Sequence, residues 1–207
     1  MQFNPETTET STIYKLLTGA VVPRPIGWIS TVDNAGVNNL APYSFFNAFS
    51  ADPPHVIFGS GRATPNEHNR FNKDTVSNIM ETGEFVVNMV SEATAEAMNL
   101  TSATLPPDVD EFVHANLTAV PSEMVAAPRV GESLVNFECK MVHSYEVEES
   151  RGGGSMIVIG RVVMIHVADE ILGERNRINY EAYKPVGRLA GGGYCRVNQI
   201  FDMPRPA

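Results

Sequence analysis

Lys73, Asp74 and Thr75 stand together where a helix is expected to begin, and their residue types could bind an anion. Asp74 can cap a helix over residues 75–81, whose apolar side chains recur at helical spacing. The first N–H groups of a helix are unpaired and carry the positive end of its dipole, so a lysine and a hydroxyl beside them could hold a phosphate. From these residues alone, an ordinary capped helix start with a solvated lysine is the alternative.

Two further segments combine groups that a planar ligand with polar edges would need. Residues 40–47, Leu-Ala-Pro-Tyr-Ser-Phe-Phe-Asn, join aromatic surface to a hydroxyl and an amide. The same residues could instead form a strand edge and pack into the core. Residues 188–194, Arg-Leu-Ala-Gly-Gly-Gly-Tyr, could let the backbone approach a ligand beneath an aromatic lid, or could form a flexible loop.

The sequence lacks the residue patterns of a metal site, a dinucleotide-binding loop and a nucleophilic hydrolase. The histidines are scattered over the positions His55, His68, His114, His143 and His166. They lack the spacing of metal ligands, so we expect structural roles for them and no metal site. The segment 59–61 is Gly-Ser-Gly, but Thr64 and Pro65 follow, which rules out a dinucleotide-binding fingerprint. A Gly-x-Ser-x-Gly elbow is also missing, and the pattern identifies no catalytic acid, base or nucleophile.

A mainly β architecture is expected to position these residues. Strands are predicted over residues 21–31, from 37 onward after a turn at 32–36, and over 55–59, 84–90, 133–149 and 155–169. The last two are joined by a glycine-rich turn at 151–154, as in an antiparallel hairpin. Helices are predicted over residues 75–81, ending at Gly83, over 92–100, and briefly near Tyr180. Residues 101–129, with four prolines, indicate a long irregular excursion.

Composition bounds the class of protein. A chain of 207 residues favours one domain, which we assign to residues 1–207 with a core at about 13–194. The net charge of -9 opposes binding to nucleic acid and to anionic membrane surfaces. Residues 1–12 are polar and lack the pattern of a secretory signal, and no transmembrane span is expected. Together with two isolated cysteines, these features predict a cytoplasmic protein with reduced thiols.

Several segments occur in one order and together resemble the flavin reductase-like family of FMN-binding split barrels. That family includes flavoredoxins and the reductase components of two-component monooxygenases. The resemblance rests on residues 23–31, 39–47, 52–54, 73–75, 82–88, 98–102, 110–112 and 128–130. It spans roughly residues 13–194. One departure lies in the tail, where Ala190 replaces the first glycine of the usual Arg-Leu-Gly-Gly and one further small residue intervenes.

The resemblance implies a six-stranded antiparallel split β-barrel with helical insertions, and a homodimer with FMN near the subunit interface. It also implies a set of flavin-binding residues: Ser30, Thr31, Ala41, Pro42, Tyr43, Ser44, Asn47, Ser60, Lys73, Thr75 and Arg188. Lys73 and Thr75 would contact the phosphate.

The activity implied is that of an NAD(P)H-dependent flavin reductase. FMN is the expected cofactor, FAD is the alternative, and NAD(P)H would be a transient co-substrate. Because the flavin carries the redox chemistry, a catalytic side chain is not required. Two other functions stay open: an electron carrier that receives electrons from a protein donor, and a flavin-binding protein without catalysis. A monooxygenase or another electron-transfer protein is the expected partner.

Overall fold

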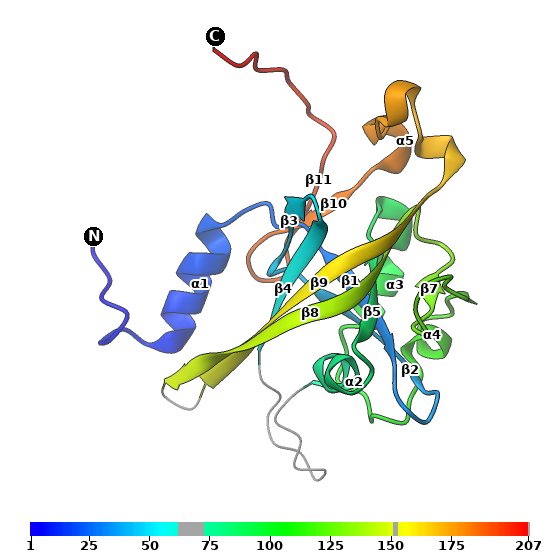
Figure 1. Ribbon diagram of the computed structural model, residues 1–207. Coiled ribbons are helices and arrows are strands. Elements are labelled where there is room, and N and C mark those ends of the chain that lie inside the picture. Colours follow the sequence, from blue (N-terminus) through cyan, green and yellow to red (C-terminus); the bar gives the residue numbers. More distant parts are fainter. Residues whose placement is uncertain (62–72, 151–152, 207) are drawn as a thin grey trace.

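The computed structural model describes residues 1–61, 73–150 and 153–206 (Figure 1). Within them, seven strands form one antiparallel sheet in the order β2-β1-β5-β8-β9-β4-β3. Their bounds are β1 (Gly27–Val32), β2 (Asn38–Tyr43), β3 (Phe46–Ala51), β4 (Pro54–Gly61), β5 (Glu84–Met89), β8 (Val135–Ser150) and β9 (Gly153–Val167). Two short pairs accompany the sheet: β6 (Ala119–Val120) with β7 (Arg129–Val130), and β10 (Val186–Arg188) with β11 (Tyr194–Arg196).

The two edges of this sheet are consecutive in the chain. Ser44 and Phe45 alone separate β2 at one edge from β3 at the other. Three Cα steps of 3.8 Å cannot span more than about 11 Å, so the sheet must curl until its edges nearly meet. The mainly β fold and the split barrel are therefore as predicted. The sheet has seven strands instead of six because the chain turns at Ser44 and continues as β3 along the opposite edge.

Helices cover parts of the sheet and extend from it. Their bounds are α1 (Thr10–Ala20), α2 (Asp74–Thr82), α3 (Ala95–Leu100), α4 (Glu111–His114) and α5 (Tyr180–Tyr183), with single turns at η1 (Glu92–Thr94), η2 (Asp169–Ile171) and η3 (Glu174–Asn176). Three of these match the predicted helices at 75–81, at 92–100 and near Tyr180. Residues 101–129 are largely irregular, as predicted, with α4 and the short strands β6 and β7 among them.

Three local predictions need correction. Helix α2 begins at Asp74, so the N-cap is Lys73, whose side chain makes no capping hydrogen bond. Asp74 instead lies in the first turn, where its negative charge interacts favourably with the positive end of the helix dipole. The first strand begins at Gly27 and not at residue 21, because Pro23 and Pro25 cannot donate ladder hydrogen bonds. Helix α1 was not predicted from the polar amino terminus.

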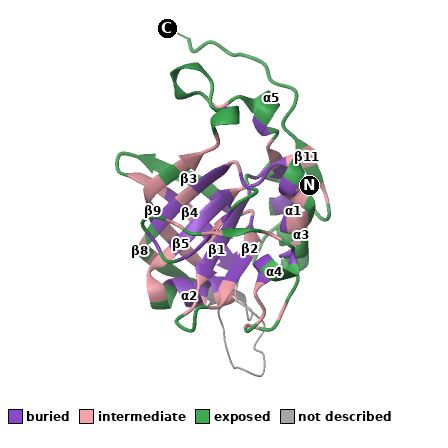
Figure 2. Ribbon diagram, turned by 90° about the vertical axis from the view of Figure 1, so that its right-hand side faces the viewer, coloured by how far each residue is buried: buried purple, intermediate pink, exposed green. Residues whose placement is uncertain are grey.

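The core lies on both sides of β1 (Figure 2). On one side, Ile29, Phe58 and Phe85 pack inside the curved sheet, closed by Ile79 from α2. The rings of Phe58 and Phe85 are 5.7 Å apart and nearly perpendicular. On the other side, Trp28, Leu40, Met98 and Phe112 join β1 and β2 to α3 and α4. Burial on both faces makes β1 and β2 rigid supports for the residues at their ends.

Some sequence features fall outside the described residues. These are His68, Thr64 and Pro65, and the first two residues of the 151–154 turn, although the strands on either side of that turn pair as predicted. Among the helices that the structure describes, none has the length and apolar character needed to cross a membrane.

Candidate functional site

A cavity of about 200 Å³ opens where β2, the start of α2 and the loop after α3 meet. Five predicted site residues line it: Ala41, Pro42, Tyr43, Lys73 and Thr75. The remaining lining residues had no predicted site role: Asn39, Asp74, Thr101, Ser102, Ala103, Thr104, Leu105 and Glu111. Tertiary contacts thus join β2, the start of α2, the loop after α3 and the start of α4, and several of the added residues carry hydroxyl groups.

Within the described part of the chain, Lys73 is the one positively charged residue that lines this cavity. Its side chain is exposed, and Nζ lies 5.7 Å from the centre of the Tyr43 ring. No carboxylate of the described residues forms an ion pair with it. The backbone of Lys73 accepts the first helical hydrogen bond, from Ser77 N at 3.0 Å, so the earlier N–H groups of α2 have no partner within the helix. This is the arrangement that binds phosphate at helix starts.

Thr75 is 1% exposed and is held by β2. Its Oγ1 accepts a hydrogen bond of 2.8 Å from Asn39 Nδ2. The buried hydroxyl of Tyr43 has no hydrogen-bond partner among the described residues. Burial raises the pKa of Tyr43, although the Thr75 and Ser60 hydroxyls lie close enough to lower it in part. Ser60, another predicted site residue, is therefore beneath Tyr43 and not in the lining of the cavity.

Glu111 is a buried acid in the same cavity. It is 8% exposed, and its Oε2 accepts a hydrogen bond of 3.1 Å from Leu40 N. Burial raises the pKa of Glu111 to about 7; backbone N–H groups of Glu111 and Leu40 oppose this shift, while the charges of Asp74 and Asp110 add to it. Asp110 is the N-cap of α4 and accepts from Phe112 N at 2.8 Å. An anion in this cavity would therefore meet acidic as well as basic groups.

Ser30 and Thr31 lie inside the protein, away from the cavity lining. Ser30 Oγ donates to Pro128 O at 2.5 Å and accepts from Asn88 Nδ2 at 3.0 Å. Thr31 Oγ1 accepts from Asn78 Nδ2 at 3.1 Å. Both residues are fully buried. Their hydroxyls therefore hold β1 against its neighbours, and a direct contact with a ligand would require these hydrogen bonds to change.

Ser44 lies at the turn between β2 and β3, where Arg24 contacts it. Arg24 is 5% exposed, and its Nε donates to Ser44 Oγ at 3.3 Å. The other guanidinium nitrogens donate to Thr18 O at 2.6 Å, to Val21 O at 3.0 Å and to Leu189 O at 3.0 Å. Arg24 thus ties α1 and the carboxyl-terminal loop to this turn. It belongs to the segment 23–31 that carried the family resemblance, but no role was predicted for it.

Asn47 and Arg188 lie near this turn and not in the cavity. Asn47 is exposed on β3, and its Oδ1 accepts from Ala48 N at 2.8 Å. The Arg188 guanidinium lies 4.4 Å from the centre of the Tyr194 ring and donates to the carbonyl oxygens of Gly193 and Gly191. The predicted site residues therefore form three groups. Five line the cavity, and Ser30, Thr31 and Ser60 lie in the interior. Ser44, Asn47 and Arg188 form a turn-and-loop group.

A larger cavity, about 600 Å³, lies between α3 and the β10–β11 pair, and we do not assign the site to it. Its cation, Arg196, is already paired with Glu92 at 2.8 Å, and none of the predicted site residues lines it. Volume alone therefore does not identify the site. Within the described residues, no group of three histidine, cysteine or acidic side chains could hold a metal ion.

Loop residues were the main omission of the sequence analysis. Thr101, Ser102 and Thr104 follow α3 in the irregular segment, and loops held by a rigid scaffold often carry binding residues. The segments 98–102 and 110–112 supported the family resemblance without an assigned role. The several hydroxyl side chains at the start of the irregular segment 101–129 were the sequence feature that could have indicated these binding residues.

Known proteins resemble this chain over most of its length, in sequence and in fold. The family model described as flavin reductase like domain matches residues 19–186, which include the cavity but end before Arg188. An uncharacterized protein of Aquifex aeolicus is 43% identical over 197 residues, covering 95% of this chain and 96% of that protein. Nitrilotriacetate monooxygenase component B from Bacillus cereus is 37% identical with a TM-score of 0.91, and 98% of each chain is covered. The 2-nitrobenzoate 2-nitroreductase NbaA of Pseudomonas fluorescens is 30% identical with a TM-score of 0.85, over 100% of this chain and 96% of that one.

Proposed function

Because the chain belongs to the flavin reductase like family, we propose that it binds FMN and transfers electrons from NAD(P)H to flavin. The observation that carries the proposal is the cavity at Lys73, in which a cation, several hydroxyls and the start of α2 converge. A phosphate monoester is largely dianionic near neutral pH and needs charged and polar donors of this kind. The buried hydroxyl of Tyr43, close to the Thr75 hydroxyl, is a further polar group that a ligand network could use.

The cavity could hold only part of a flavin cofactor. Pockets that enclose a whole drug-sized ligand measure about 300–1,000 Å³, and this cavity of about 200 Å³ is smaller. We therefore assign only the phosphate end of the cofactor to it. The isoalloxazine ring would extend along the segment from Pro42 to Ser44, toward Arg24 and the carboxyl-terminal loop.

The residues of this chain would bind and orient the cofactor. Lys73 neutralises phosphate charge, Thr75 and the loop hydroxyls donate hydrogen bonds, and Arg24 holds the turn at Ser44. FMN, when bound, supplies the redox chemistry by accepting a hydride from the nicotinamide. The protein would then have to bring the isoalloxazine and nicotinamide rings together and to exclude water.

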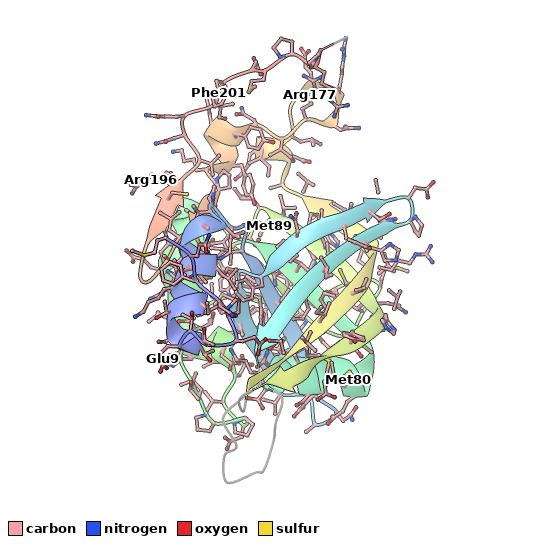
Figure 3. All side chains as sticks on the ribbon, turned by 90° about the vertical axis from the view of Figure 1, so that its left-hand side faces the viewer. Glu9, Met80, Met89, Arg177, Arg196 and Phe201 are labelled. Atoms are coloured by element: carbon pink, nitrogen blue, oxygen red, sulfur yellow. The ribbon has the colours of Figure 1, made fainter. Side chains whose placement is uncertain are left out.

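We also propose that the protein is a homodimer, because a large apolar surface lies beside the site. Five of the six β3 residues are exposed, and Phe45 and Phe49 are 53% and 64% exposed. Within the described residues, α1 buries Thr18 alone and exposes Tyr14 and Leu17. The carboxyl-terminal segment beyond β11 runs away from the sheet with Phe201 pointing outward (Figure 3). Exposed apolar area of this extent beside an open sheet edge is typical of an interface.

The physiological acceptor is inferred from one similar protein, and the compartment from the cysteines. The similarity to a monooxygenase component B favours a reductase that supplies reduced flavin to a monooxygenase. The two free cysteines fit a cytoplasmic location.

The cofactor assignment is tested by replacing Lys73 with Met, which keeps the apolar stem and removes the charge. FMN binding, followed by fluorescence titration, should weaken by about 1.5–3 kcal/mol, the range for hydrogen bonds to charged groups. Riboflavin lacks the phosphate and should bind the wild type and Lys73→Met alike. Lys140→Met is the matched control, because Lys140 is an exposed lysine on β8 that pairs with Glu84. If Lys73→Met and the wild type bind FMN equally, the phosphate assignment is wrong.

Activity measurements separate the reductase from the electron carrier. Rapid NAD(P)H oxidation with free flavin as acceptor is the result we expect. Slow oxidation with NAD(P)H, together with fast reduction by a protein donor, would instead identify an electron carrier. A protein that binds neither FMN nor riboflavin would contradict the proposed function as a whole.

A further inference from the structure

Glu111 occupies a wall that two cavities share. It lines the cavity at Lys73 and also a cavity of about 30 Å³, which Asp33, Asp74 and Asn78 line as well. Its hydrogen bond from Leu40 N fixes the carboxyl group against β2, one residue from Asn39, whose amide holds Thr75. Glu111 is therefore positioned by the same strand that positions a proposed phosphate ligand.

The charges around Glu111 are mostly negative. Asp74 faces it from the first turn of α2, Asp110 from the N-cap of α4, and Asp33 from the end of the β1–β2 hairpin. Lys73 is the cation that lines the cavity, and within the described residues no cation forms an ion pair with Glu111. Tyr43 is the remaining titratable group of the lining, and His114 is exposed at the far end of α4.

An ionised Glu111 would oppose a phosphate in this cavity. A carboxylate beside a dianion repels it and so offsets part of the attraction of Lys73 and of the start of α2, and the repulsion is strengthened because Glu111 is buried. Asp110 is held as an acceptor by Asn38 Nδ2 at 2.9 Å and by Phe112 N, both of which stabilise a carboxylate. Glu111 accepts from backbone N–H groups, among them Leu40 N, and within the described residues no side chain donates a hydrogen bond to its carboxyl group.

We propose that Glu111 is the proton-linked residue of the phosphate cavity: it carries a proton taken up from solvent when a phosphate monoester binds, and its ionisation weakens that binding. This inference rests on the proposed function, since the ligand is the phosphate of FMN. The binding equilibrium balances in charge and protons: the protein with ionised Glu111, the dianionic ligand and one proton combine to give a complex in which the Glu111 carboxyl group is neutral. A neutral carboxyl also offers an O–H donor in place of a repelling charge. The pKa of about 7 in the free protein allows this change near neutral pH.

Calorimetric titration of FMN in buffers of different ionisation enthalpy measures the proton uptake directly. Between pH 7.5 and 9 the phosphate is already dianionic, because its second pKa is about 6. Above pH 8, where a free carboxyl group with a pKa of about 7 is almost fully ionised, the wild type should take up close to one proton per FMN, and its dissociation constant should rise by up to about tenfold per pH unit. Glu111→Gln should take up no proton, and its dissociation constant should stay constant over this range. Riboflavin should show no proton uptake with either protein.

The controls separate this inference from the proposed function. Glu96→Gln removes an acid that lines the larger cavity and should keep the profile of the wild type. The proton uptake of the wild type needs no variant, so the test holds even if Glu111→Gln folds poorly. FMN binding without proton uptake, or an equal pH dependence in Glu111→Gln, would overturn the role of Glu111 alone. If FMN does not bind to the wild type at all, the proposed function fails instead.

Discussion

The cavity at Lys73 and the face formed by β3 and α1 meet at the turn of Ser44 and Phe45, yet they are built in opposite ways. In the cavity wall, buried polar groups such as Thr75 and Glu111 are held by partners from distant parts of the same chain. On the β3–α1 face, Phe45, Phe49 and Tyr14 are exposed and large. In the proposed homodimer, one chain would preform the phosphate end of the site, whereas the ring end would become enclosed only when a second chain packs against it.

The first way to test this contrast is to break the polar interior that supports the cavity. Asn88 is fully buried; it donates to Trp28 O at 2.9 Å and to Ser30 Oγ at 3.0 Å, and it accepts from Val130 N and Asn136 Nδ2, both at 2.8 Å. Asn88→Ala leaves several of these groups without partners. We expect the free energy of unfolding, measured with urea, to fall by about 3 kcal/mol or more.

A surface asparagine provides the matched control for that experiment. Asn34 is exposed and donates to Glu81 at 3.2 Å, so Asn34→Ala should change the free energy of unfolding by less than about 0.5 kcal/mol. Equal effects for Asn34→Ala and Asn88→Ala would show that the buried network does not hold β1 and β5 in place.

The second test concerns the apolar face. Phe49→Asp places a charge on β3, and a twofold interface contains each substitution twice. We expect the dimer to weaken by at least about 2 kcal/mol, or about thirtyfold in its dissociation constant, so that sedimentation at micromolar concentration gives the mass of one chain, 22.6 kDa. Val113→Asp changes an exposed valine on α4 and should leave the dimer intact. A wild type that sediments as a single chain with FMN bound would contradict the homodimer.

The smallest effect is expected at Arg188, which contacts its own loop. Its stacking on Tyr194 is worth less than about 1 kcal/mol at an exposed site. Arg188→Ala should therefore weaken FMN and riboflavin by the same small factor in fluorescence titrations. A loss confined to FMN would mean that Arg188 reaches the phosphate, and it would remove the division between the cavity and the turn-and-loop group.

Local elements were largely predictable from the sequence. The periodicity of residues 75–81 and the glycine that follows identified α2, which ends at Gly83 with φ of +74°. The long β-rich stretches gave the β8–β9 hairpin. Helix α1 escaped prediction because its apolar residues Tyr14 and Leu17 face solvent instead of a core. Strand β3 was not separated from β2, since the turn at Ser44 lies within one continuous aromatic segment.

The site was predictable only in part, for a physical reason. The sequence was enough to select Lys73, Thr75 and the Pro42–Tyr43 segment, which line one cavity in the structure, because residue type and helix-start position are local properties. Burial and hydrogen-bond partners are not local. Tertiary packing alone placed Ser30 and Thr31 in an interior network and brought Glu111 against Leu40 N. Desolvation and neighbouring charge change the acidity of a carboxyl group, and both depend on which distant segments the fold brings together.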